Sequence, residues 1–90
     1  MTRKYIPIGV DRNRYMELYY RVRRYDTLDA KERGKIDAAM EKIQKGRTGK
    51  RMLRAIIDGV PYKCLDIPYS EREYSRIKRR FYEELDKTVK

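Results

Sequence analysis

A dense run of cations near the C-terminal end holds the side chains that are best suited to bind a ligand. From Ser70 to Arg80 the sequence reads SEREYSRIKRR, with serines and arginines at helical spacing. A guanidinium group donates hydrogen bonds in a planar fork, which matches phosphate oxygens and the edge of a guanine base. A serine at the start of a helix adds an anion-binding point, because the free amides of the first turn point outward there. The candidate DNA-binding residues of this run are Ser70, Arg72, Ser75, Arg76, Lys78, Arg79 and Arg80.

A second set of cations comes earlier in the chain. Arg47, Arg51 and Arg54 recur at intervals of four and three residues, so they share one side of a helix if this stretch is helical. Lys63 follows in a short segment before the C-terminal run. We add these four residues to the candidate DNA contacts because they precede that run so closely. The plainer alternative is a solvated helix face without a binding role.

The overall charge agrees with a polyanionic partner. The 90 residues include 24 Lys and Arg against 14 Asp and Glu, which gives a net charge of +10. Such an excess favours nucleic acid, an acidic protein or an anionic membrane surface. Since the cations are spread along the chain, the excess belongs to the surface of the fold and not to a separate tail.

Several classes of chemistry are excluded by the composition. The sequence has no histidine, and its single cysteine, Cys64, excludes an internal disulfide. Without histidine there is no histidine-assisted nucleophile and no His–Cys metal site, and the acidic residues lack the spacing of a carboxylate site. We therefore expect no enzyme activity and no cofactor. No apolar run is long enough to cross a membrane and the N-terminus lacks a signal-peptide core, so we expect a cytoplasmic protein that does not bind membranes.

The helix that must position the C-terminal cations is predicted at residues 67–85. Pro68 and Tyr69 break the chain, and Ser70 with Glu73 forms an S-x-x-E capping box. Tyr74, Ile77, Phe81 and Leu85 then recur at three and four residues and predict one buried face. Arg72, Arg76 and Arg79 fall on the opposite face. The second half of the helix is expected to serve packing, since it carries Tyr82, Glu83, Glu84 and Asp86.

The rest of the chain predicts a single all-α domain over residues 1–90, a compact bundle of four to five helices. Residues 1–10 are read as an extended N-terminal arm, either frayed or reaching toward nucleic acid. Residues 11–45 are predicted to hold two helices, one at 12–25 capped by Asp11 and one at 28–45 capped by Asp26 or Thr27. The second would end at Lys45 and Gly46 and contains Gly34, which weakens its first turns. A third helix is expected at 49–58, stopped by Gly59, and a short one at 62–66.

Residues 48–87 together predict a helix-turn-helix, in which the second helix enters the major groove. The run 59–85 resembles the C-terminal helix-turn-helix of phage transcriptional regulators of the ArpU and RinA type and, more distantly, region four of sigma factors. Ser70, Tyr74, the run Arg76-Ile77-Lys78-Arg79 and Leu85 match that pattern. The segment before Ser70 is shorter than in the sigma-like pattern. The resemblance implies sequence-specific binding of double-stranded DNA by a phage or mobile-element regulator.

Two other interpretations stay open. A small phage-type protein could bind a host protein, such as RNA polymerase or a defence nuclease, through a basic, tyrosine-rich surface. The arginines could also be no more than a solvated face. A homodimer formed through Met16 and Tyr20 of the first helix would add the second half-site that helix-turn-helix proteins normally use.

Overall fold

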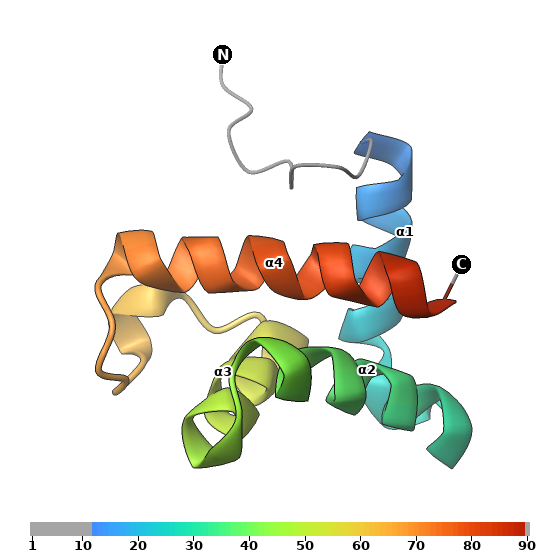
Figure 1. Cartoon of the computed structure of the whole chain (residues 1–90), viewed down its shortest axis with the longest axis horizontal. Helices are drawn as coiled ribbons and strands as arrows, with labels where there is room; N and C mark the ends of the chain where they lie inside the picture. Colours follow the sequence, from blue (N-terminus) through green and yellow to red (C-terminus); the bar gives the residue numbers. More distant parts are fainter. Residues whose placement is uncertain (1–11, 90) are drawn as a thin grey trace.

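The structure, a computed structural model, describes residues 12–89 and is entirely helical in its regular elements (Figure 1). The predicted arm at 1–10 and the Asp11 cap lie outside the described residues. The predicted small all-α bundle is confirmed. Its elements in order are α1 (Arg12–Arg23), the 3-10 turn η1 (Tyr25–Thr27), α2 (Ala30–Ile43), α3 (Gly46–Asp58), the 3-10 turn η2 (Tyr62–Cys64) and α4 (Glu71–Val89).

The start of α2 differs from the prediction. Asp29, not Asp26 or Thr27, is its N-cap, and the Asp29 side chain accepts a hydrogen bond of 2.9 Å from the backbone N–H of Glu32. Asp26 and Thr27 lie in η1 instead. The helix continues through Gly34 without a break.

The junction of α2 and α3 was also placed wrongly. Helix α2 ends at Ile43, and α3 begins at Gly46, whose φ of +82° lies in the left-handed region that glycine adopts without strain. Gly49 then lies against the end of α2, since a Cβ there would come within 1.8 Å of the carbonyl oxygen of Gln44. The two helices therefore turn more tightly than the predicted end at Lys45 and start at Gly49 would allow. The end of α3 at Gly59 is as predicted.

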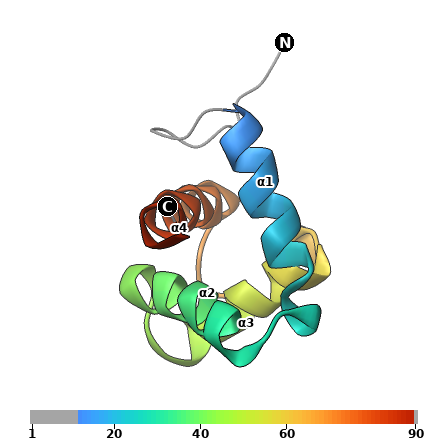
Figure 2. The same ribbon diagram turned by 90° about the vertical axis from the view of Figure 1, so that its right-hand side faces the viewer.

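The core is built from the inner faces of all four helices. Helix α4 packs against α2 and α1, and α3 packs against the same two helices. In both Figure 1 and Figure 2, α4 lies on one side of the molecule and α2 with α3 on the other, while α1 passes the C-terminal half of α4. The buried side chains of α4 are Tyr74, Phe81, Tyr82 and Leu85, and those of α1 are Leu18 and Val22.

The buried face of α4 is wider than the predicted stripe. Ile77 is only partly buried, whereas Tyr82 is 1% exposed and packs edge-on to Tyr15 of α1 at 5.1 Å between ring centroids. Asp86 is also buried, and its Oδ1 accepts a hydrogen bond of 2.5 Å from Nε of Arg14. This confirms the prediction that the second half of α4 serves packing. Because both α1 and α2 pack against α4, more of its circumference is buried, and the residues there must be apolar or paired.

No helix within residues 12–89 combines the length and apolar character needed to span a bilayer. The same residues contain no group of three acidic or cysteine side chains placed to hold a metal ion.

Candidate nucleic-acid interface

The first turn of α4 is fixed by the capping box that the sequence predicted. The backbone N–H of Glu73 donates to Oγ of Ser70, and the N–H of Ser70 donates to Oε1 of Glu73, both at 3.2 Å. Each residue thus satisfies a backbone donor that the helix itself leaves free. Ser70 is exposed, so its hydroxyl lies at the surface as well as in the cap.

The segment before α4 is held by aromatic contacts. The Tyr62 hydroxyl donates to the carbonyl of Tyr69 at 2.5 Å, and the Tyr62 ring lies 5.8 Å from that of buried Tyr74. The short helix predicted at 62–66 is reduced to the single 3-10 turn η2. A 3-10 turn and a break therefore precede α4 where a short helix was predicted, and α4 packs against α2 and α1 and not against a full preceding helix.

Three exposed arginines run along the outward face of α4. Arg72, Arg76 and Arg80 are four residues apart, which separates their Cα atoms by about 6 Å along the helix axis. Arg79 lies beside them and is half-buried. No carboxylate in the described part of the chain forms an ion pair with any of these four side chains. Their charges are therefore uncompensated at the surface.

Several cations elsewhere in the bundle join one helix to another. Arg21 of α1 pairs with Glu32 of α2 at 2.9 Å, and Lys42 of α2 pairs with Glu84 of α4 at 3.0 Å. The Lys42 contact also holds the pKa of Glu84 below its ordinary value. The contrast with the α4 arginines separates cations that hold the fold from cations that do not.

Lys78 does not belong to the outward row. Four residues after Tyr74, it falls on the inner side of the helix, and at about 100° per residue it points about 160° away from Arg76. Its Nζ lies 5.9 Å from the centroid of the buried Tyr74 ring, and burial lowers its pKa. Lys78 thus lies at the edge of the core; this position disfavours its predicted contact with DNA phosphate, which stays a prediction. Ser75 is half-buried, on the edge between the inner and outer faces.

Two of the α3 arginines have structural contacts. Arg54 pairs with Asp26 at 2.8 Å and with Asp58 at 3.2 Å, and these bonds, chiefly the one to Asp26, raise its pKa. The hydrogen bond from Arg54 lowers the pKa of Asp26. Arg51 donates to the backbone carbonyl of Asp66 at 2.8 Å. These residues tie α3 to η1 and to the loop before α4.

The structure does not bring the α3 set and the α4 set onto one face. In Figures 1 and 2, α3 and α4 lie on different sides of the molecule, and the buried residues of both helices face the common core. The exposed residues of the two helices, Arg47 and Arg76 among them, therefore face away from that core in different directions. Lys63 is exposed in η2, which packs against α4, and so lies nearer the candidate interface. Lys87 is also exposed on α4, seven residues after Arg80, but it lies beyond the first turns that carry the candidate interface.

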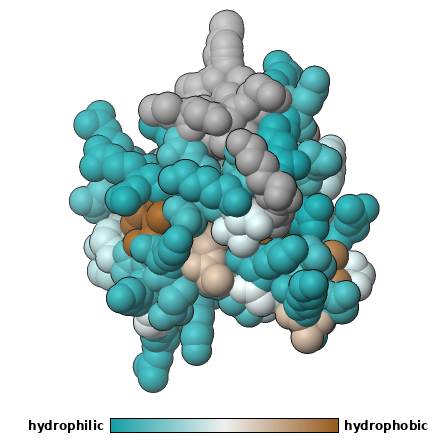
Figure 3. Space-filling view, turned by 45° about the vertical axis from the view of Figure 1, so that its right-hand side comes forward, coloured by the Kyte–Doolittle hydropathy of each residue, from teal (hydrophilic) through white to brown (hydrophobic). Residues whose placement is uncertain are grey.

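One face of the molecule is predominantly polar (Figure 3). On the face shown in Figure 3, apolar side chains form small, separate patches among hydrophilic ones. In comparisons with known proteins, no family model, no curated protein and no solved structure matches the chain. The described residues form a small helical bundle in which Arg72, Arg76 and Arg80 of α4 make no ion pair, and the resemblance to phage regulators stays a prediction.

Proposed function

We propose that the protein binds double-stranded DNA through the outward face of α4, as a sequence-specific regulator of the phage or mobile-element kind. The observation that carries the proposal is the row of Arg72, Arg76 and Arg80 on a capped helix, without carboxylate partners in the described residues. A major groove about 12 Å wide admits a helix of this diameter.

Rigidity supports this role. The inner face of α4 carries Phe81 and Leu85, both 0% exposed, and burying each side chain contributes about 1.5–3 kcal/mol. The capping box fixes the first turn. The arginines thus start from a backbone that is already in place, so binding has to order only their side chains.

Different residues of α4 are expected to contact base edges and phosphates. Arg76 and Arg80, exposed on the outward face, are the candidates for base edges, while Arg72 and Lys63 near the start of the helix are candidates for phosphate. Glu83 follows on the same side and would meet phosphates unfavourably. Contact is therefore expected from the first turns, up to Arg80.

A salt titration of duplex binding tests the proposal. The logarithm of the association constant should fall with the logarithm of salt concentration by about 0.9 per phosphate contact. Replacing a phosphate contact such as Arg72 by alanine should reduce that slope by about one unit. In a selection from random duplexes, Arg76→Ala should relax the preference at one position by about 1–3 kcal/mol.

Arg24→Ala is the matched control. Arg24 is equally an exposed arginine, but it follows α1 and lies outside the proposed interface. Its replacement removes the same charge and should leave both slope and preference nearly unchanged. Equal losses of DNA affinity in Arg24→Ala, Arg72→Ala and Arg76→Ala would show that binding depends only on net charge. Absence of binding at low salt would reject DNA as the partner.

A further inference from the structure

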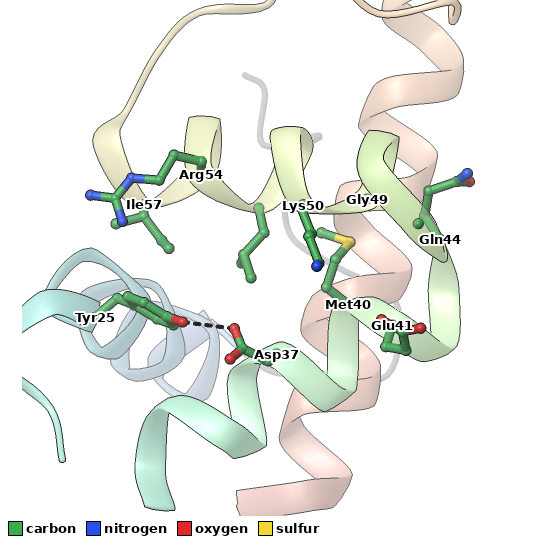
Figure 4. Close-up of a pocket in the computed structure, with 11 residues that line it drawn as sticks. Tyr25, Asp37, Met40, Glu41, Gln44, Gly49, Lys50, Arg54 and Ile57 are labelled. Carbon is green, nitrogen blue, oxygen red and sulfur yellow. Dashed lines mark hydrogen bonds between the residues drawn. The ribbon is translucent and has the colours of Figure 1, made fainter. Parts of the chain in front are cut away.

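A pocket that the sequence gave no sign of lies between α2 and α3. Its volume is about 290 Å³, and its floor is formed by Met40, Leu53 and Ile57. Tyr25 of η1 closes one end, and the tight α2–α3 turn lies at the other (Figure 4). No residue of α4 lines the pocket, so occupying it leaves the outward arginines uncovered.

The two walls of the pocket carry opposite charges. Asp37 and Glu41 stand one turn apart on α2, and Lys50 and Arg54 stand one turn apart on α3. Although they face the same space, no ion pair joins the two walls among the described residues. Arg54 is turned to Asp26 and Asp58, and Lys50 points from α3 into the space between the helices (Figure 4).

Asp37 is oriented by the end wall. The Tyr25 hydroxyl donates to Oδ1 of Asp37 at 2.8 Å. Burial, followed by that hydrogen bond, raises the pKa of Tyr25, so the phenol stays a neutral donor at physiological pH. Glu41 and Lys50 form no ion pair or side-chain hydrogen bond in the described part of the chain. An apolar floor thus lies between an unpaired carboxylate and an unpaired ammonium group.

We propose that this pocket receives one bulky apolar side chain from a partner protein, in a segment with a basic residue toward α2 and an acidic residue toward α3. The volume is just below the usual range of small-molecule sites, about 300–1,000 Å³, which suits a single anchoring side chain better than a whole ligand. The carboxylates of α2 disfavour nucleic acid. A second copy of the chain is disfavoured because each carries a net charge of +10.

This interaction goes beyond the proposed DNA binding and does not depend on it. With α4 on DNA and the α2–α3 pocket filled, the protein would connect a nucleic acid to another protein. A partner protein, which the sequence left open as an alternative, would then bind at the α2–α3 pocket and not at the α4 arginines.

Peptide titrations of the full-length protein test the proposal. The probes are helical peptides with one tryptophan flanked one turn away by lysine and glutamate, and analogues with two lysines, two glutamates or alanine for tryptophan. Methyl NMR signals of Met40, Leu53 and Ile57 report on the floor. The mixed-charge tryptophan peptide should shift these signals and the alanine analogue should not.

Glu41→Lys tests the charge pattern without touching the core, because Glu41 is exposed. The substitution should weaken binding of the mixed-charge peptide by about two- to fivefold, the range of an exposed ion pair, and strengthen binding of the peptide with two glutamates. Lys50→Glu should favour the peptide with two lysines. The proposal is overturned if the floor signals do not move, if the alanine analogue moves them equally, or if charge reversal leaves the ranking unchanged. Free tryptophan binding as tightly as the peptide would also overturn it and indicate a metabolite site. Since no DNA is present, any of these results leaves the DNA-binding proposal standing.

Discussion

Replacing Gly49 by alanine should destabilise the protein, although alanine is the better helix former. A Cβ at Gly49 would lie 1.8 Å from the carbonyl oxygen of Gln44 and 2.9 Å from its carbon. Since contacts below 3.0 Å are essentially absent for real Cβ atoms, the gap must open by at least 3.0 − 1.8 = 1.2 Å. The obstructing atoms belong to the backbone, so no flexible side chain can absorb the change.

The size of the effect follows from three contributions. Overpacking of this kind costs about 1–3 kcal/mol. Moving Gln44 also strains the 2.8 Å hydrogen bond from its N–H to the Met40 carbonyl, a bond worth about 1 kcal/mol. Helix propensity returns about 1 kcal/mol. The expected net loss is therefore about 1–3 kcal/mol, which lowers the Tm of a domain this size by at least about 4 °C.

Gly34→Ala is the matched control. Gly34 also lies inside a helix, but nothing lies within 4 Å of a Cβ added there. The same chemical change should raise stability by up to about 1 kcal/mol, or about 4–8 °C in Tm. Far-UV circular dichroism during thermal and urea unfolding measures both variants. If Gly49→Ala proved as stable as the wild type, the tight α2–α3 turn described for this fold would be wrong.

Two further substitutions test the capping box and the inward position of Lys78. Ser70→Ala should lower the free energy of unfolding by about 1 kcal/mol, whereas Ser70→Asp should keep most of the wild-type stability. The urea midpoint measures both. An alanine variant as stable as the wild type would show that the cap contributes nothing. Lys78→Met should raise the Tm at neutral pH and leave DNA binding unchanged. Because the folded pKa of Lys78 is lowered from 10.5, the unfolded chain holds the proton more tightly, and wild-type stability rises as pH climbs from the lowered pKa toward 10.5. The difference in Tm between variant and wild type should shrink over that window, and a difference independent of pH would mean that the Lys78 charge is not desolvated.

Local signals predicted the start of α4 and the end of α3 correctly. The capping box joins residues three apart, and the Gly59 stop depends on one residue's freedom to take a φ of +73°. Both interactions act within a single turn, so they are readable from neighbouring residues. The buried stripe at Tyr74, Phe81 and Leu85 was readable for the same reason.

The α2–α3 junction was misplaced because two glycines compete there. Gly46 and Gly49 are equally plausible helix boundaries in the sequence. Their roles are separated by the carbonyl of Gln44, which approaches Gly49 only once both helices are packed. The pocket between these helices was unpredictable for a related reason, since its floor and walls come from three elements that meet only in the folded protein.

The sequence by itself determined an all-α chain, a capped C-terminal helix and a large excess of positive charge. Only the tertiary structure decided which cations are uncompensated. Arg54 meets Asp26 from 28 residues away and Arg14 meets Asp86 from 72 residues away, whereas Arg72, Arg76 and Arg80 meet no carboxylate in the described chain. Helical periodicity fixes the face on which a side chain lies, but the partner of a charge depends on what packing brings opposite it.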